Sequence, residues 1–251
     1  MQIRSAILGL VCLLVLASCG KDGDFTLTGK INGLKKGKIY LQRIEDTSLV
    51  NIDSVIVDGN PEFEFITDLK EPQIVYLTLE KVDAYEYDDR IMIFAEPGEM
   101  TLNTSLKNFE SQAAITGSQN QQKLDEYSKV IHRFNDKNLD LIKRSFEVRK
   151  EGIEDSIIYY DTQLQNLMKR KYLYTVNFAI TNKEFEIAPY LAVSEIFDAN
   201  IKYLDTIYTS LKPKVRKSKY GKALKDYIEE RKETNANEAT TTTIDSTVVE
   251  E

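Results

Sequence analysis

The stretch Thr116-Gly117-Ser118-Gln119-Asn120 divides this sequence into two parts with different patterns of hydrophobic residues. Before it, short segments alternate apolar and polar side chains, as in Phe63-Glu64-Phe65, which is typical of half-buried β-strands. After it, apolar side chains recur at steps of three and four residues, which is typical of amphipathic helices. The change of period predicts an α+β protein, with a β-rich domain over residues 25–116 and a helical domain over residues 117–232.

The β-rich domain is predicted to contain seven short strands between residues 25 and 103. Turn signals separate the strands, among them Asn32-Gly33 and Asp58-Gly59. No helical pattern interrupts this region. Short strands at such spacing predict an antiparallel β-sandwich or an open barrel.

The helical domain is predicted to begin with two long helices, the first from about Gln119 to Lys150, with Gly152 separating it from the second. The two helices are expected to pack as an antiparallel α-helical hairpin. The apolar positions that recur at steps of mainly three and four residues in the first helix are Leu124, Tyr127, Ile131, Phe134, Leu141 and Ile142. A third helix should open at Ala188-Pro189, since proline suits the first helical turn.

Further short helices are expected around residues 203–211 and 219–232. Residues 233–251 are rich in Thr and Glu and poor in large apolar side chains. Such a composition buries too little apolar surface to fold, so it predicts a disordered tail.

The N-terminus has the features of a secretion signal. One basic residue, Arg4, precedes an apolar run from Ala6 to Ala17, which is shorter than the roughly 20 residues of a transmembrane helix. The residues Leu16-Ala17-Ser18-Cys19 resemble the lipobox of bacterial lipoproteins. This resemblance implies that residues 1–18 are a cleaved signal peptide and that Cys19 carries the lipid anchor.

Residues 19–24 would then form a short polar tether between the lipid and the folded domain. Gly20, and not aspartate, follows the cysteine, so outer-membrane delivery is the expectation for a Gram-negative lipoprotein. The tether carries Lys21, Asp22 and Asp24. These charges fit either a signal for cell-surface display or a soluble spacer on the periplasmic face, and both alternatives stay open.

The composition excludes several classes of protein. The chain has 33 basic and 40 acidic residues and a net charge of −7, which argues against nucleic-acid binding. Of its two cysteines, Cys12 would leave with the signal and Cys19 would bind lipid. The folded part would then lack thiols, which excludes disulfides, thiolate catalysis and cysteine metal sites. No phosphate-binding loop, nucleophile motif or cofactor signature is present, so no cofactor and no metal are expected.

Four groups of residues are candidate sites. Residues 83–89 concentrate acidic side chains, as a Ca²⁺ loop does, but the segment lacks a glycine turn and a solvated loop is favoured. His132 is the single histidine, and a surface or partly buried residue is favoured over a general base. Glu96 and Glu99 match the acid and base of a glycosidase in type, although glutamates beside a Pro-Gly turn are usually solvated.

The fourth group is a basic cluster around Pro213. Its members are Lys212, Lys214, Arg216, Lys217, Lys219 and Lys222. Such a cluster can bind anionic lipid headgroups. A solvated connection between helices is the favoured interpretation.

Several of these features together resemble a family. The opening Phe25–Gly33, the stretch from Asp58-Gly59 to Phe63-Glu64-Phe65 and the hairpin Ile93–Leu102 resemble an uncharacterised β-rich N-terminal domain of Gram-negative envelope lipoproteins. The junction at Thr116-Gly117-Ser118 and the closing run Tyr190–Gly221 resemble the helical part of that family, so the likeness spans residues 25–232. In longer relatives a thioredoxin-like thiol-disulfide domain follows, and this sequence ends instead at the Thr-rich tail.

The resemblance implies an envelope lipoprotein without the activity of those longer relatives. The expected function is therefore non-catalytic: a binding or scaffolding module, attached to the membrane through its lipid, with an unknown protein or glycan partner. The alternative is an accessory protein that docks a thioredoxin-like thiol-disulfide exchange partner in trans.

Overall fold

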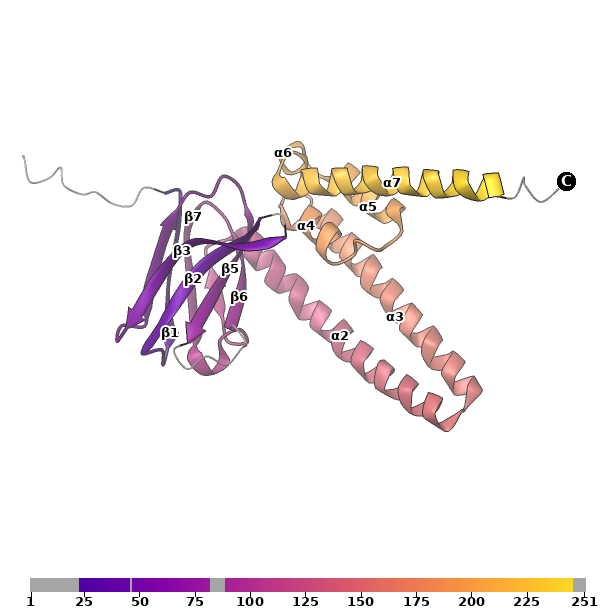
Figure 1. Cartoon of the computed structure of the whole chain (residues 1–251), viewed down its shortest axis with the longest axis horizontal. Helices are drawn as coiled ribbons and strands as arrows, with labels where there is room; N and C mark the ends of the chain where they lie inside the picture. The colour runs from indigo at the N-terminus through magenta and orange to yellow at the C-terminus, as the bar shows by residue number, and fades with distance from the viewer. Residues whose placement is uncertain (1–22, 46, 82–88, 246–251) are drawn as a thin grey trace, which may run out of the picture.

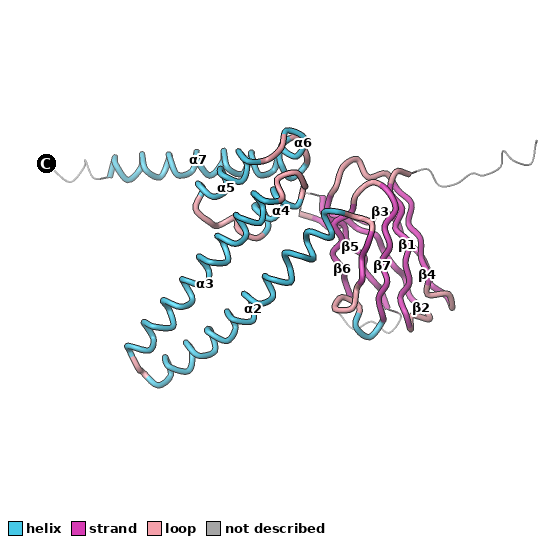
Figure 2. Tube along the Cα trace, turned by 180° about the vertical axis from the view of Figure 1, so that it is seen from behind, coloured by secondary structure: helices cyan, strands magenta, loops and turns pink. Residues whose placement is uncertain are grey.

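The computed structural model describes residues 23–45, 47–81 and 89–245 (Figure 1). Two β-sheets form the N-terminal part and helices form the rest, so the predicted α+β class is confirmed. Figure 2 shows the same division from behind, with the strands gathered on one side of the molecule and the helices on the other.

Eight strands build the two sheets. They are β1 (Phe25–Asn32), β2 (Lys36–Glu45), β3 (Ser48–Asp58), β4 (Glu62–Thr67), β5 (Gln73–Lys81), β6 (Asp89–Ala95), β7 (Gly98–Ser105) and β8 (Ala114–Thr116). Sheet A has the strand order β4-β1-β7-β8 and sheet B has the order β3-β2-β5-β6. Both sheets are open, so the sandwich is confirmed over the barrel.

Two details differ from the sequence prediction. Strand β8 is additional to the seven predicted strands, because three residues carry too little alternation to be recognised. The pair β1 and β7 is parallel, with Phe25 beside Gly98 and Leu27 beside Met100, whereas an antiparallel sandwich was expected. No tight turn joins these two strands, since β2 to β6 lie between them in the chain, so turn geometry does not impose an antiparallel pairing.

The sandwich core lies between the two sheets. Alternate side chains of each strand point inward, and Phe65 from sheet A and Leu77 and Ile93 from sheet B are fully buried there. Gly29 of β1 lies closely between its partners in the neighbouring strands of sheet A, Phe63 of β4 and Leu102 of β7. A Cβ at this position would lie 2.0 Å from the carbonyl oxygen of Leu102 and 2.5 Å from Cζ of Phe63, so only glycine fits.

The helical part follows sheet A. Its elements are α2 (Gln119–Glu151), α3 (Glu154–Thr181), α4 (Ile187–Ser194), α5 (Ile201–Ser210), α6 (Pro213–Arg216) and α7 (Lys219–Asp245), and a 3₁₀ turn, η2 (Leu106–Asn108), precedes them. Helices α2 and α3 form the predicted antiparallel hairpin, which projects away from the sandwich (Figure 1). Gly152 ends α2 in the left-handed region at φ 71°, and its N–H donates to the carbonyl of Arg149.

The two hairpin helices are held together along their length. Near the base, the Tyr127 hydroxyl bonds the Thr175 hydroxyl at 2.8 Å. Thr175 in turn donates to the carbonyl of Lys171 at 3.0 Å, so Tyr127 is the donor to Thr175. Near the turn, Arg149 pairs with Asp161 at 2.5 Å.

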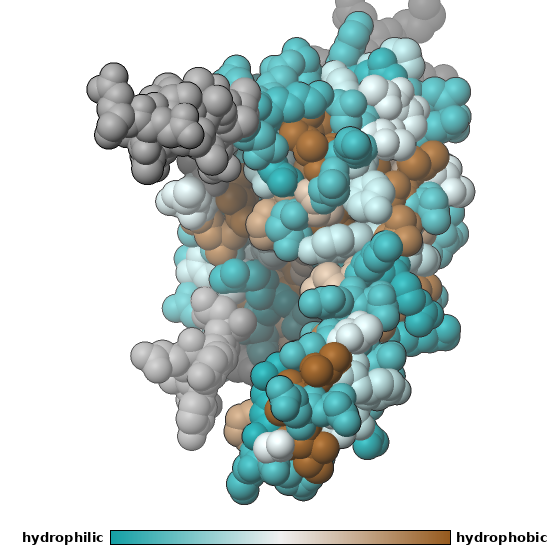
Figure 3. Space-filling model, turned by 90° about the vertical axis from the view of Figure 1, so that its right-hand side faces the viewer, coloured by the Kyte–Doolittle hydropathy of each residue, from teal (hydrophilic) through white to brown (hydrophobic). Residues whose placement is uncertain are grey.

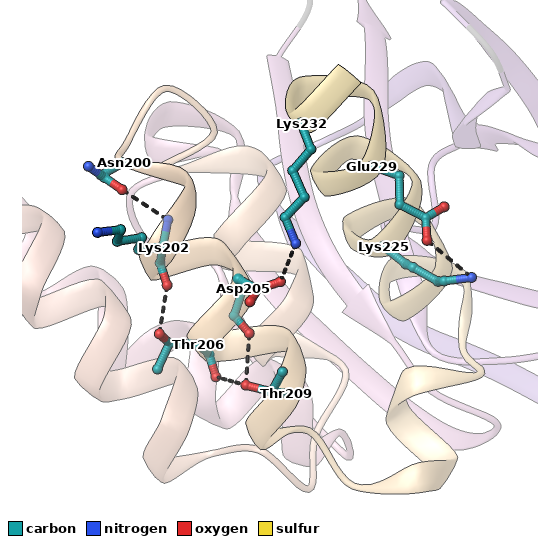
Figure 4. A network of polar contacts seen from close by, with 8 residues as sticks. All are labelled: Asn200, Lys202, Asp205, Thr206, Thr209, Lys225, Glu229 and Lys232. Carbon is teal, nitrogen blue, oxygen red and sulfur yellow. Dashed lines mark hydrogen bonds and ion pairs between the residues drawn. The ribbon is translucent and has the colours of Figure 1, made fainter. Parts of the chain in front are cut away.

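Helices α4 to α7 pack around a second apolar core that includes Ala188, Ile196, Leu204 and Leu224. Figure 4 shows the polar contacts on the outside of this core, where Lys232 of α7 reaches Asp205 of α5 at 2.9 Å. Helix α7 continues to Asp245, although composition predicted disorder from Glu233 onward. A helix that has already formed adds one backbone hydrogen bond for each further residue it orders, so propagation is much easier than nucleation. Residues 246–251 of the predicted tail lie outside the described residues.

Candidate functional site

The hairpin is attached to the sandwich by a glutamate that caps helix α2. The carboxylate of Glu96, directly after β6, accepts the backbone N–H groups of Gln119 at 3.2 Å and Asn120 at 2.6 Å. The Ser118 hydroxyl accepts the N–H of Gln121 at 2.9 Å. Three N–H groups that a helix start leaves unpaired are thus satisfied, and the negative charge of Glu96 faces the positive end of the helix dipole.

This role corrects the expectation that Glu96 is an ordinary solvated residue of a Pro-Gly turn. The second glutamate of the suggested acid-base pair, Glu99, is exposed near the start of β7. Glu96 is bound to a helix start, so its carboxylate has a structural role that Glu99 does not share.

Asn120 extends this contact to helix α4. Its side chain is 1% exposed, and its amide nitrogen donates to Glu96 at 2.6 Å and to Glu186 at 3.0 Å. Its amide oxygen accepts the N–H of Ile187 at 2.7 Å, at the start of α4. Both amide hydrogens and the carbonyl oxygen therefore have partners, so this buried polar group joins β6, α2 and α4 without an unsatisfied atom.

Helix α2 also bonds to β6, one of the two edge strands of sheet B. The amide oxygen of Gln121 accepts the N–H of Phe94, an edge residue of β6, at 2.7 Å. The amide nitrogen of Gln121 donates to Asp125 at 2.8 Å. Burial raises the pKa of the Asp125 carboxyl, while the bond from Gln121 acts in the opposite direction.

A second glutamate caps helix α7. Glu71, in the loop between β4 and β5, accepts the N–H of Lys219, the first residue of α7, at 2.6 Å. The next residue, Tyr220, accepts the N–H of Ile74 through its hydroxyl at 2.9 Å. Two helices far apart in the sequence therefore both begin against glutamates of the sandwich.

An apolar cluster fills the space between these polar contacts. This junction cluster consists of Ile74, Phe94, Leu124, Tyr127, Ile131, Ile187 and Leu191. Tyr190 and Tyr220 pack edge-on against Phe94, with ring centroids 5.5 and 5.9 Å away. Burial raises the pKa of Tyr190 to about 12. The base of the hairpin is thus fixed to the sandwich by both packing and hydrogen bonds.

The distal half of α2 carries large apolar side chains in solvent. Leu139 is 65% exposed, Ile142 is 48% exposed and Phe146 is 71% exposed. Their spacing of three and four residues places them in one row along the helix, here called the apolar stripe. Hydrophobic side chains are visible on the lower end of the hairpin in Figure 3. Ile142 belongs to the periodic apolar positions that predicted this helix, and the structure leaves it exposed.

The packed face of α2 lies beside the apolar stripe. Leu141 is 6% exposed and Ser145 is 6% exposed. At about 100° per residue, the stripe lies roughly a quarter turn from this packed face. On α3, Ile158 is 61% exposed and lies roughly a quarter turn from the face that contacts α2, on the same side of the hairpin. One side of the hairpin is therefore apolar and uncovered by the described chain.

The sequence contained a signal for this stripe that the interpretation missed. Between residues 124 and 146, apolar residues fall into two overlapping rows with helical spacing, and the prediction treated them as one. Leu139 and Phe146 were neither among the periodic apolar positions named for this helix nor among the candidate sites. If the apolar residues of the two rows are counted separately, they predict a helix with more apolar surface than one partner helix can cover.

The other predicted site residues lie apart from this surface. Leu16, Ala17, Ser18 and Cys19 fall outside the described residues, as does the acidic segment except Asp89, which opens β6. His132 is exposed on α2. Within residues 23–45, 47–81 and 89–245, no group of three or more His, Cys, Asp or Glu could hold a metal ion.

The basic cluster near Pro213 is partly used in contacts within the fold. Lys212 pairs with Glu184 at 3.6 Å. Arg216 donates to the carbonyl of Thr209 and lies 5.7 Å from the ring centroid of Tyr208.

Among the helices that the structure describes, none is long and apolar enough to cross a membrane.

The protein is a β-sandwich with a helical hairpin whose base is fixed to the sandwich by helix caps and by the junction cluster. Residues 25–124 match the family model of a domain of unknown function, DUF4369, so the chain contains such a domain. This agrees with the predicted uncharacterised N-terminal domain. The match covers all eight described strands and the first turn of α2, so it includes Glu96 and Asn120. A comparison with curated proteins gave no match to this chain.

Proposed function

We propose that this protein is a lipid-anchored envelope protein that acts without catalysis, as a binding or scaffolding module, and that the hairpin α2–α3 is its binding element. The observation that carries the proposal is the apolar stripe. Single exposed apolar side chains are common on protein surfaces, whereas a contiguous row of them marks an interaction site. The capped and packed base of the hairpin would hold this row in a fixed position relative to the sandwich.

The proposed anchor is Cys19, which follows the lipobox-like residues Leu16-Ala17-Ser18. The lipid of a bacterial lipoprotein has two or three acyl chains, and stable attachment needs at least two membrane signals of this kind. Because Gly20 follows the cysteine, the proposed location is the outer membrane, on its periplasmic face or at the cell surface.

Metabolic labelling with palmitate tests the anchor. The Cys19→Ala variant should lose the label and leave the membrane fraction or stay uncleaved. The matched control is Cys12→Ala, which alters the other cysteine of the N-terminus and should keep the label. Labelled, membrane-bound Cys19→Ala protein would contradict the proposal. Proteinase K on intact cells then distinguishes surface display, where the protein is degraded, from the periplasmic face, where it is protected.

Cross-linking in intact envelopes tests the binding element. The tagged wild-type chain should yield cross-linked species that are lost in the double variant Ile142→Ser/Phe146→Ser. Arg133→Ser is the control, because Arg133 is exposed on another face of the same helix. If the double variant keeps every cross-linked species of the wild type, the hairpin is not the binding element.

The second candidate function is docking of a thioredoxin-like partner in trans. It rests on the DUF4369 match together with the resemblance of this region to longer lipoproteins that carry such a domain. Identification of a thioredoxin-like protein among the cross-linked species would favour it. A neighbouring gene for polysaccharide uptake or secretion would favour the binding or scaffolding module.

A further inference from the structure

The apolar stripe has the spacing of a coiled-coil seam. Leu139, Ile142 and Phe146 follow one another at steps of three and four, which is the alternation of the two core positions in a heptad. The same spacing continues to Asn135 on one side and Arg149 on the other. The seam is therefore short, with three apolar core positions between polar ones.

Two charged residues beside the apolar part of the seam, Asp136 and Lys143, are complementary in an antiparallel arrangement. Asp136 and Lys143 each directly follow a core position, so they lie on the same flank of the stripe, and both are exposed. When two identical helices pack antiparallel, the same flank of each meets the other. Asp136 of each copy then meets Lys143 of the other. In a parallel pair these residues would instead meet the opposite flank, which faces α3 and carries the half-buried Asn138 and the buried Ser145.

The apolar side chains align in the same antiparallel arrangement. With the two-fold axis between positions 140 and 141, Ile142 of one copy lies beside Leu139 of the other, and Phe146 lies beside Asn135. Ile158 lies on the same side of the hairpin, so α3 of each copy would flank the helix pair. Two hairpins that meet on this side would form a four-helix arrangement with an isologous interface.

The exposed area fits a reversible contact of this kind. The three stripe side chains expose roughly 400 Å² of apolar surface, about half of what each partner of a standard interface buries. Such a contact is weak in dilute solution. Attachment of both copies to one membrane would raise their effective concentration and strengthen it.

We infer that the occupant of the apolar stripe is a second copy of this chain, bound through an antiparallel α2–α2 contact. The inference rests on the proposed function, because it names the partner of the hairpin. It also specifies the register of the two α2 helices, with Asp136 of one copy opposite Lys143 of the other and Leu139 opposite Ile142.

Cysteine cross-linking of the full chain in envelopes tests this register. The variant Asp136→Cys/Lys143→Cys should give a strong dimer band with a short thiol cross-linker, and each single variant a much weaker one. The two cysteines can also be linked within one chain, but such a link gives no dimer band, so the dimer band reports only contacts between copies. Arg133→Cys, on another face, is the matched control and should stay at the background of the wild-type chain, which would offer no free thiol once Cys19 is lipidated. A dimer band no stronger in the double variant than in Arg133→Cys overturns the inference.

Charge reversal gives an independent measurement, by sedimentation of the detergent-solubilised chain. Asp136→Lys places like charges together at two symmetric sites and should weaken dimerisation about fivefold. Adding Lys143→Asp should restore the wild-type dimer, which a loss of folding would not allow. Failure of the second change to restore the dimer contradicts the register.

The outcomes separate this inference from the proposed function. Stripe-dependent cross-links to a different protein only, with no dimer, overturn self-association and leave the hairpin as a binding element. Cross-links that persist unchanged when the stripe is replaced overturn both. A wild-type chain without palmitate label would overturn the proposed anchor and leave the register to the sedimentation experiment, which measures the contact between copies away from the membrane.

Discussion

The side-chain nitrogen and the backbone N–H of Asn120 both donate to the same oxygen of Glu96, each at 2.6 Å. One carboxylate thus fixes the first turn of α2 to the end of β6. Asn120 also contacts Glu186 and the N–H of Ile187, so the start of α4 depends on the same residue. This contact, together with the junction cluster, fixes the base of the hairpin on the sandwich, several helical turns from the apolar stripe.

Replacement of Glu96 should loosen this junction. Glu96→Gln removes the negative charge at the start of α2 and exchanges one acceptor oxygen for a donor, so the free energy of unfolding should fall by about 1–2 kcal/mol. Urea unfolding followed by circular dichroism measures the change. Glu99→Gln, an exposed site on the same turn, should stay within about 0.5 kcal/mol of wild type. Equal effects of the two variants would refute the capping role.

The buried tyrosines should make the fold sensitive to alkaline pH. Burial raises the pKa of Tyr190 from 10.0 to about 12, so the folded state keeps a proton that the unfolded state loses. Stability from this group is complete below pH 10 and falls as the pH rises from about 10 to about 12, by up to about 1.4 kcal/mol per pH unit. Tyr190→Phe should flatten this decline in urea unfolding at pH 9 to 11. Tyr159→Phe, at an exposed site, is the control, and an unchanged slope for Tyr190→Phe would contradict the argument.

The turn of the hairpin depends on the backbone of Gly152. Its φ of 71° lies in the left-handed region, and a Cβ there would meet no atom within 4 Å. Gly152→Ala should therefore destabilise the chain by about 1 kcal/mol through backbone strain alone. Gly152→Asn should lose less, because asparagine tolerates this region better. Thermal unfolding of the three proteins would show the order, and an alanine variant as stable as wild type would exclude strain at this turn.

Local signals in the sequence predicted the elements of the fold well. The change of hydrophobic period at Gly117 marks the passage from strands to helices, and Gly152 marks the hairpin turn. Both signals depend on a few neighbouring residues. The parallel pairing of β1 with β7 depends on strands that are distant in the chain, and no local pattern encodes it.

The candidate site was harder to predict from the sequence, because its contacts also join residues that are distant in the chain. Glu96 lies 24 positions before Asn120, so no capping motif of fixed spacing identifies it. The exposure of Ile142 beside the burial of Leu141 depends on which side of α2 faces α3, and the two residues are adjacent in the sequence. Cys19, on which the proposed anchor depends, lies outside the described residues and stays a sequence prediction.

Adjacent rows on α2 should therefore respond differently to truncation. Leu141 is buried between the hairpin helices, so Leu141→Ala should lower the free energy of unfolding by about 2–3 kcal/mol through lost burial and an unfilled space. Phe146 is the larger side chain but is 71% exposed, so Phe146→Ala should change stability by no more than about 0.5 kcal/mol.

Both variants are best measured by urea unfolding in dilute solution, where copies of the chain are apart, and again at high protein concentration. Leu141→Ala should show its deficit at both concentrations, because the loss lies within one hairpin. Phe146→Ala should match wild type when dilute and fall behind it when concentrated, because mass action then stabilises only the protein whose stripe binds a second copy. A large deficit for Phe146→Ala in dilute solution would mean that its side chain packs within its own chain, and the apolar stripe would then not be a free surface.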